Sequence, residues 1–277
     1  MNTFAALDLH ISLAAEKVFS IGPFAVTNAL FTGAIATLGL VAVLFYVAHK
    51  VKNGSYNRFV GFIQWVVESL LAQVDDVIGN KALARKIAPL AITIFLFVLV
   101  NYWMGVLPGV GPITVDGIPL LRSLTADLNF TIMLSVVTMV AVQLYAIKRH
   151  GFFGNAGRYL RNPLKNPIGA FEGFLELIGE FSRLVALSLR LFGNTFAGEV
   201  LLILIAVLSG YLAGLSLPVV MVFELFIGFI QAYVFFMLTL IFAALAQESH
   251  GGEHDETPDP SHHSSAGTSK KSLPARE

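Results

Sequence analysis

The sequence lacks cysteine and is poor in charge, and these absences exclude several classes of function. Without cysteine the chain has no disulfide, no thiolate nucleophile and no Cys-ligated metal cluster. Only 13% of the residues are charged, and the 18 basic side chains balance the 18 acidic ones, so nucleic acid is not an expected partner. No phosphate-binding glycine loop, nucleophile triad or set of metal ligands is evident. We therefore expect no cofactor, no metal and no nucleotide chemistry in this chain.

Apolar residues, in contrast, are abundant: 56% of the chain is hydrophobic and the mean hydropathy is +0.74. This composition predicts an all-α, polytopic membrane protein. Five stretches could each cross about 30 Å of hydrocarbon, namely Phe24 to Val47, Ile87 to Leu107, Leu128 to Ile147, Phe171 to Leu208 and Leu217 to Leu245. A sixth stretch, Tyr56 to Val77, carries several polar residues and is interpreted as an amphipathic helix at the membrane surface. The alternative is a weakly hydrophobic sixth span.

Basic residues in short loops predict the orientation of the spans. They gather after the first span, before the second, and between the third and fourth, and we place these loops in the cytoplasm: Lys50, Lys52, Arg58, Lys81, Arg85, Lys86, Lys148, Arg149, Arg158, Arg161 and Lys165. The opposite side carries Lys17 and Arg122. The N-terminus is then outside and the C-terminus inside, in a bacterial plasma membrane. The first residues lack the basic start of a cleaved signal peptide.

The composition changes from Gln247 onward to Gly, Ser, His, Pro and charged residues, which cannot bury enough apolar surface to fold alone. We therefore divide the chain into an exterior segment (1–23), a transmembrane helical domain (24–247) and a disordered cytoplasmic tail (248–277). The histidines of the tail could bind a metal, but their irregular spacing favours a solvated tail: His250, His254, His262 and His263.

The fourth span combines charge with small residues on one side. A continuous helix over Phe171 to Leu208 would be about 57 Å long, so we expect the last two helices to be long and strongly tilted. Five of its polar residues fall within about 40° of one line: Glu172, Glu176, Arg183, Arg190 and Asn194. Gly179, Ser182, Ala186, Gly193 and Ala197 lie on the same side. An arginine at membrane depth costs on the order of 3 kcal/mol, so the pattern favours a separate protein surface next to Arg190. Ordinary helix packing is the alternative.

Glu199 faces the opposite side of that helix, about 180° from Arg190 and about 13.5 Å further along. In the last span, Glu224 and Gln231 are seven residues apart and share one face. If the two helices are antiparallel with Gln231 level with Arg190, Glu224 lies within about 3 Å of the depth of Glu199. We therefore predict that two carboxylates share a site in the outer half of the membrane. Both cannot ionise easily at low dielectric, so one of them could relay protons.

Three acids lie on the other side of Arg190, at Glu172, Glu176 and Glu180. They either line a path from the cytoplasm or simply meet water near a helix end. Acid outside, arginine midway and acid inside is a pattern that suits two aqueous half-paths separated by a fixed positive charge.

At these residues the chain resembles subunit a of the rotary F-type ATP synthase, over about Phe24 to Gln247. The most specific motif is Leu189-Arg190-Leu191-Phe192-Gly193-Asn194 with Ala197-Gly198-Glu199. Supporting motifs are Gln231-Ala232-Tyr233-Val234-Phe235 with Leu238-Thr239, Thr125-Ala126-Asp127-Leu128-Asn129, and Ile87-Ala88-Pro89-Leu90 before Asn101 and Leu107-Pro108.

The resemblance implies a non-catalytic, proton-translocating stator subunit in the membrane, with ATP chemistry on other subunits. It implies that Arg190 faces the c-subunit ring, that Asn194 and Gln231 flank it, and that the peripheral-stalk b subunits and lipid are further partners. Glu199 matches the outer half-channel acid, and Asn101 matches a polar position near it. Some relatives carry histidine at the position of Glu224, which leaves the relay geometry open. We add Glu176 to the ion pathway, whereas Asp127 and Asn129 could instead cap the third span.

Two other functions remain open at this point. A self-contained ion channel or secondary transporter would conduct when purified alone, although the lack of an evident internal repeat weakens the transporter. A membrane scaffold would need Arg190 for assembly but not for coupling. The sequence does not decide between proton and sodium ion.

Overall fold

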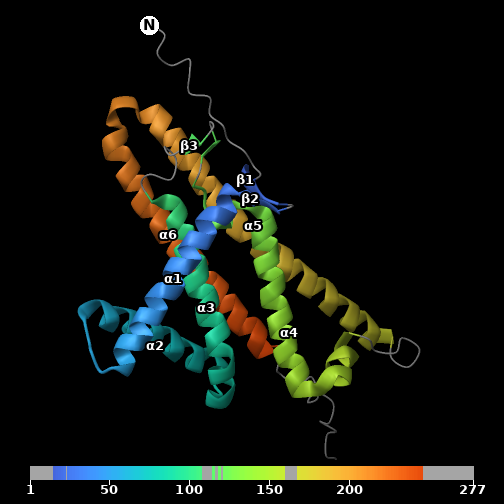
Figure 1. Ribbon diagram of the computed structural model, residues 1–277. Helices are drawn as coiled ribbons and strands as arrows, with labels where there is room; N and C mark the ends of the chain where they lie inside the picture. The colour runs from blue at the N-terminus through green and yellow to red at the C-terminus, as the bar shows by residue number, and fades with distance from the viewer. Residues whose placement is uncertain are drawn as a thin grey trace, which may run out of the picture. The chain divides into compact units, whose positions relative to one another are not determined.

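The computed structural model describes residues 15–22, 24–107, 114–115, 118–119, 121–159 and 167–245. Within these residues the protein is all-α apart from two short hairpins, as predicted (Figure 1). The elements in chain order are β1 (Lys17–Ile21), β2 (Phe24–Thr27), α1 (Asn28–Lys52), α2 (Arg58–Ile78), α3 (Lys81–Val106), β3 (Thr114–Val115), β4 (Ile118–Pro119), η1 (Leu124–Ala126), α4 (Leu128–Tyr159), α5 (Pro167–Ser209), η2 (Gly210–Leu212) and α6 (Ala213–Leu245). The tail with its histidines, and the loop residues Arg161 and Lys165, lie outside the described residues.

The first long helix begins at Asn28, and our prediction that it starts at Phe24 was wrong. Phe24–Thr27 instead forms strand β2, which pairs antiparallel with β1. The reason is local: Thr27 has extended backbone angles, and its hydroxyl oxygen accepts a hydrogen bond from the backbone N–H of Leu30 at 3.2 Å. This cap starts α1 one residue later, and the apolar residues before it are free to pair as a strand.

Helix α2 covers nearly the whole of the Tyr56 to Val77 stretch that the sequence predicted to be helical. It begins after Asn57, whose side chain accepts a hydrogen bond from the first helical N–H, and ends at Gly79, whose φ of +66° suits a left-handed C-cap. One side of α2 is buried against the neighbouring helices, at Val60, Leu70 and Val74. The helix also leaves large aromatic side chains exposed, including Phe59, Phe62 and Trp65.

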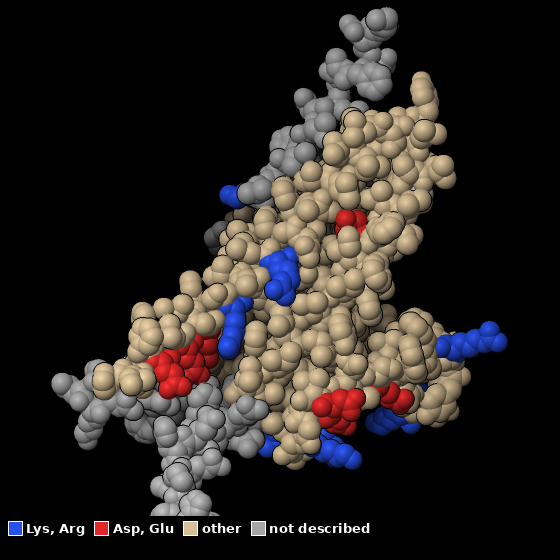
Figure 2. Space-filling model, turned by 180° about the vertical axis from the view of Figure 1, so that it is seen from behind, with Lys and Arg blue, Asp and Glu red and all other residues tan. Residues whose placement is uncertain are grey.

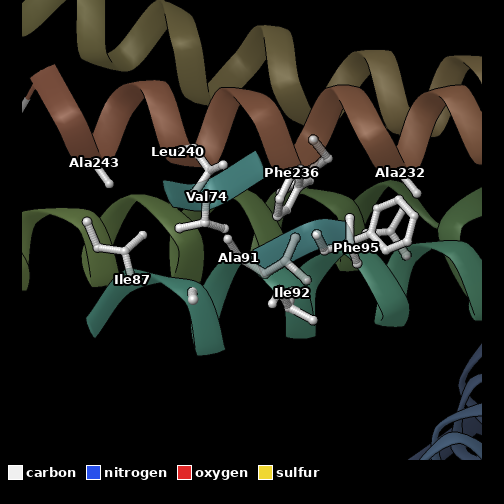
Figure 3. Close-up of a cluster of buried hydrophobic side chains, with 14 of the residues drawn as sticks. Val74, Ile87, Ala91, Ile92, Phe95, Ala232, Phe236, Leu240 and Ala243 are labelled. Carbon is white, nitrogen blue, oxygen red and sulfur yellow. The ribbon is translucent and has the colours of Figure 1, made fainter. Parts of the chain in front are cut away.

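The hydrophobic core lies mainly between α3 and α6, with α2 beside them. Figure 3 shows Phe236 and Leu240 of α6 facing Ala91 and Phe95 of α3, with Val74 of α2 in the same cluster. Alanines at the contact let the helices approach closely, and the aromatic rings fill the space between them. This packing fixes α6, and therefore its polar residues, against α3.

The last two helices form an antiparallel pair that turns at η2 (Figure 1). Gly210 has a φ of +51° there, a conformation that glycine adopts without strain. Helix α5 has 43 residues and is about 64 Å long, close to the length expected from the sequence. Helix α4 continues beyond the predicted Leu128 to Ile147 stretch, because it bends at Gly151 with φ +76° and then resumes.

The surface of the described helices is strongly apolar. Four helical runs are long and apolar enough to cross a membrane: Asn28–Lys52, Lys81–Val106, Leu128–Lys148 and the α5–η2–α6 run Pro167–Leu245. In the last run, no residue of the most apolar window is buried within the chain. Figure 2 shows a face where charged atoms form only a few separated patches in an otherwise uncharged surface. Apolar side chains at such exposure require lipid or another protein, so the chain is a multi-pass membrane protein.

Candidate functional site

A hydrogen bond between two amides sets the register of α5 against α6. Asn194 Nδ2 donates to Gln231 Oε1 at 2.7 Å. Gln231 is therefore level with Asn194. From the sequence we had assumed that it is level with Arg190, one helical turn earlier in α5. Relative to that assumption, α6 is shifted along α5 by four residues, or about 6 Å. Glu224 is then still about 3 Å in depth from Glu199, but beyond it along α5 and no longer before it.

Glu224 lies at the centre of the described helices, with only 3% of its surface exposed. The hydroxyl of Tyr102, from α3, donates a hydrogen bond to Glu224 Oε2 at 3.1 Å. On the α5 side, Gly198 lies against the same carboxylate, so closely that a Cβ at this position would overlap it. The site thus needs a residue without a side chain at position 198, which the sequence argument did not recognise.

Glu199 projects from the next position of α5 and forms an ion pair with Arg122. Arg122 Nε lies 3.4 Å from Glu199 Oε2, and the two side chains are 10% and 22% exposed. The backbone N–H of Ser123 also donates to the Glu199 carboxylate. Arg122 precedes η1 and is fixed by two further bonds: Nη2 donates to the carbonyl of Ala126 at 3.4 Å, and its backbone N–H donates to Thr32 at 3.1 Å.

Arg122 is a residue of this site that the sequence did not identify as part of it. We used it there only as one of two basic residues on the outer side. The available signal was its position five residues before Asp127, close to the Thr125-Ala126-Asp127 motif that precedes α4. Sequence spacing alone could not connect it to Glu199, because the two residues lie 77 positions apart in the chain.

Glu199 and Glu224 line one small cavity together with Tyr102, Ser123 and Thr195. Its volume of about 10 Å³ corresponds to about one water molecule. The lining brings side chains from α3, α5 and α6 and from the segment before α4 to one point. The two carboxylates therefore share a site, in a cavity small enough for a single bridging water.

A row of polar groups leads from this cavity to Asn101. Thr195 Oγ1 donates to Thr125 Oγ1 at 3.1 Å, Thr125 and Ser123 are joined at 2.8 Å, and Ser123 Oγ donates to the backbone carbonyl of Asn101 at 3.0 Å. Asn101 is 1% exposed, and its Nδ2 donates to the carbonyl of Phe97. Among the described residues, Asn101 Oδ1 and Gln231 Nε2 are buried polar atoms without a hydrogen-bond partner.

Arg190 lies on the other side of α5, away from the cavity. Its side chain is exposed, and within the described part of the chain no ion pair or hydrogen bond to it is found. The small residues of its face are also open: a Cβ added at Gly179 or Gly193 would have no described atom within 4 Å. Ser182, Ala186 and Ala197 are exposed as well. This small-residue face, with Arg190 in its middle, has no covering partner among the described residues.

The acids toward the N-terminal end of α5 have separate surroundings. Gln143 of α4 donates a hydrogen bond to Glu180 Oε1 at 2.6 Å. Glu176 is half-buried and Glu172 is exposed. The guanidinium of Arg183 lies over the Phe242 ring, 5.1 Å from its centroid.

Asp127 caps α4, one of the two roles that the sequence left open. Its carboxylate accepts a hydrogen bond from the backbone N–H of Asn129 at 3.0 Å, as expected for an acid at a helix N-terminus.

Comparison with known proteins identifies the family of the chain. The family model described as the ATP synthase A chain matches residues 30–244. ATP synthase subunit a of Mycobacterium tuberculosis (strain CDC 1551 / Oshkosh) is 34% identical over 233 residues, which is 82% of this chain and 90% of the relative. The subunit of Acidothermus cellulolyticus is 30% identical over 249 residues, 90% of this chain and 87% of the relative. That of Mycobacterium ulcerans is 32% identical over 234 residues, with 82% and 90% covered. A match of this identity over most of the length shows that this protein belongs to the ATP synthase A chain family.

Proposed function

We propose that this chain is the proton-translocating stator subunit of a rotary F-type ATP synthase, with two half-channels and with Arg190 facing the c-subunit ring. One observation carries the proposal: α5 presents Glu199 to an interior cavity and Arg190 to an exposed face of small residues. A single helix thereby separates a cavity lined by two acids, where a proton can be exchanged, from a fixed positive charge.

The proposed membrane arrangement has five spans, α1, α3, α4, α5 and α6, with α2 in the interface. The exposed aromatic side chains of α2 suit the interface, where such rings are enriched. Helix α5 is about twice as long as the hydrocarbon is thick, so α5 and its partner α6 are strongly tilted. The positive-inside rule places the N-terminus outside and the C-terminus in the cytoplasm, and the bacterial relatives favour the plasma membrane.

In the outer half-channel, protons reach the cavity of Glu199 and Glu224. Two carboxylates at low dielectric do not both ionise easily, so one of them holds a proton that can move on. The hydroxyl of Tyr102 keeps Glu224 in place. Asn101 Oδ1 and Gln231 Nε2 are buried polar atoms with spare hydrogen-bonding capacity, and such atoms can bind the water of a proton path.

The ring carries the proton onward. A ring carboxylate that takes up a proton becomes neutral, and a neutral acid costs far less to move into lipid than a carboxylate. After nearly a full turn it meets the inner half-channel, which we assign to Glu172, Glu176 and Glu180. There it releases its proton and returns to Arg190 as a carboxylate.

Arg190 keeps the two half-channels apart. A guanidinium retains its charge in proteins, repels a cation moving directly from one path to the other, and attracts the ionised ring carboxylate. The open Gly179 and Gly193 positions allow a ring helix to approach α5 closely. The remaining partners are lipid and the b subunits of the peripheral stalk.

Neutralising Arg190 tests the proposal. In membrane vesicles that contain the assembled complex, Arg190→Ala should abolish proton-driven ATP synthesis, and Arg190→Lys should restore little of it, because lysine lacks the planar fork and can lose its proton when buried. The matched control is Arg85→Ala, an exposed arginine at the start of α3, which should leave the rate unchanged.

Near-normal synthesis by Arg190→Ala would overturn the assignment, and loss of assembly with intact coupling in the remaining complex would favour a scaffold. Proton conduction by the purified chain without a ring would favour a self-contained channel.

A further inference from the structure

We propose that Arg122 is a positioning residue of the outer site: it binds Glu199 as a fixed counter-charge, so that Glu224 is the acid that carries the moving proton. This inference rests on the proposed function of the cavity and deepens it, because it assigns different tasks to two carboxylates that share one site.

The position of Arg122 is built into the fold. The residue is 9% exposed, its backbone is bound to Thr32 of α1, and its guanidinium reaches both the carbonyl of Ala126 and the carboxylate of Glu199. A charged side chain held by three elements at this depth keeps its place in the absence of a moving partner. The guanidinium therefore presents a constant positive charge at one wall of the cavity.

The two acids receive different hydrogen-bond donors. Glu199 is bound by the guanidinium and by the backbone N–H of Ser123, and charge-assisted donors of this kind suit an ionised carboxylate. Glu224 receives the neutral hydroxyl of Tyr102, and no cation within the described residues is paired with it. A protonated Glu224 remains compatible with this environment, because its second oxygen can donate into the cavity.

The charge balance of the site gives the same division. With both carboxylates ionised, the two acids and one guanidinium carry a net charge of one negative unit. One bound proton makes the site neutral, the state that a low-dielectric environment favours. The titratable and charged groups that face the cavity from the described elements are Arg122, Glu199, Glu224 and Tyr102. The site thus holds one mobile proton, and the contacts place it on Glu224.

A purely structural role makes a different prediction. If Arg122 only ties the segment before α4 to α5, its loss should lower the amount of assembled complex, whichever acid is then removed. If it is the counter-charge of Glu199, removal of Glu199 should rescue its loss, and removal of Glu224 should not.

The experiment is a set of variants in the full ATP synthase, assayed in vesicles for proton-driven ATP synthesis per assembled complex. Arg122→Gln should lower the rate about tenfold or more, and Arg122→Lys should stay within about threefold of wild type, since coupled charge pairs commonly show effects of this size. Arg122→Gln combined with Glu199→Gln should return to about the rate of Glu199→Gln alone. Arg122→Gln combined with Glu224→Gln should stay at or below the rate of Arg122→Gln. Arg85→Gln is the control for loss of an arginine.

A second measurement varies the pH of the outer compartment. Arg122→Gln should shift the midpoint of the outer pH profile by about one pH unit or more and leave the inner profile unchanged, whereas Arg85→Gln should shift neither. Failure of Arg122→Gln to assemble, together with normal assembly of the Arg122→Gln/Glu199→Gln pair, would also support the proposal, because it shows the cost of an unpaired buried carboxylate.

Equal rescue by either acid substitution, no rescue by Glu199→Gln, or assembly failure of both the single and the paired variant would overturn the role of Arg122. If Glu199→Gln, Glu224→Gln and Arg122→Gln all leave proton transport unchanged, the proposed outer half-channel itself is wrong.

Discussion

At the residue scale, the cavity has no room for even one additional carbon atom at Gly198. Helix α5 passes the Glu224 carboxylate at this position, and an added Cβ would overlap that carboxylate group. The obstacle is not the end of a flexible side chain in open space, because Glu224 is itself buried and bound to Tyr102. Any substitution at position 198 must therefore move the acid or separate the two helices.

We expect Gly198→Ala to reduce proton-driven ATP synthesis about tenfold in assembled complex, because a displacement near 1 Å at a reacting group can cost this much or more. Gly214→Ala is the matched control, since an added Cβ there has no described atom within 4 Å. Both rates are measured in vesicles with equal complex content. A normal rate for Gly198→Ala would mean that Glu224 has more freedom than its contacts indicate.

The two cavity acids should also act as a unit. Glu199→Gln and Glu224→Gln should each slow proton uptake from outside, and the double variant should lose much less than the product of the two single effects, because residues of one site are not independent. Glu224→His should retain appreciable function, since imidazole can also accept and pass a proton. The assay is proton pumping for wild type, both single variants and the double. Independent, multiplicative losses would contradict a shared relay.

At the scale of elements, the register of α5 against α6 decides which residues meet. The antiparallel arrangement and the depth match of the two acids could be predicted, because they depend only on helix rise and residue spacing. The level of Gln231 could not be predicted to better than a turn, since apolar ridges four residues apart pack almost equally well. The amide bond from Asn194 to Gln231 selects one of these registers.

Cysteine crosslinking tests this register, and the chain has no cysteine of its own to interfere. Asn194→Cys paired with Gln231→Cys should crosslink readily with an oxidant or a short thiol reagent, because the two native side chains meet in a hydrogen bond. Arg190→Cys paired with Gln231→Cys should crosslink several-fold less. The products are compared on denaturing gels. Preferential crosslinking at position 190 would restore the register that the sequence argument assumed.

Local patterns in the sequence predicted some features of the structure, and features that depend on packing between elements were not predicted. Helix existence followed from long apolar stretches and from the polar pattern of Tyr56 to Val77. The hairpin before α1 did not, because Phe24–Thr27 is as apolar as the helix that follows and only the Thr27 cap separates them. The role of Arg122 could not be predicted, because its partner Glu199 lies on an element that is distant in the sequence. The close contact of Gly198 with Glu224 could not be predicted either, because it depends on how the side chains pack and not on the spacing of residues.

At the scale of the whole molecule, the helical part and the tail should be separable. The tail lies outside the described residues, and the prediction rests on its composition, which is rich in polar residues and poor in apolar ones. Truncation after Ser249 should preserve most proton pumping, because no residue of the proposed path is removed. Pumping is compared in vesicles with matched complex content. A loss in correctly assembled complex would reveal a docking or regulatory role for the tail.

The bonds around α5 also have a mechanical consequence. A ring that turns past Arg190 would pull sideways on α5, and a stator must transmit this load without yielding. The polar attachments that hold α5 to its neighbours, from Asn194, Thr195 and Glu199, lie within nine residues of Arg190, or about 13.5 Å along the helix. The residues that resist the force are therefore the ones that line the cavity or border it. Torque and proton position would be coupled through the same few side chains, and a weakened attachment such as Thr195→Val should lower the load at which ATP synthesis stalls.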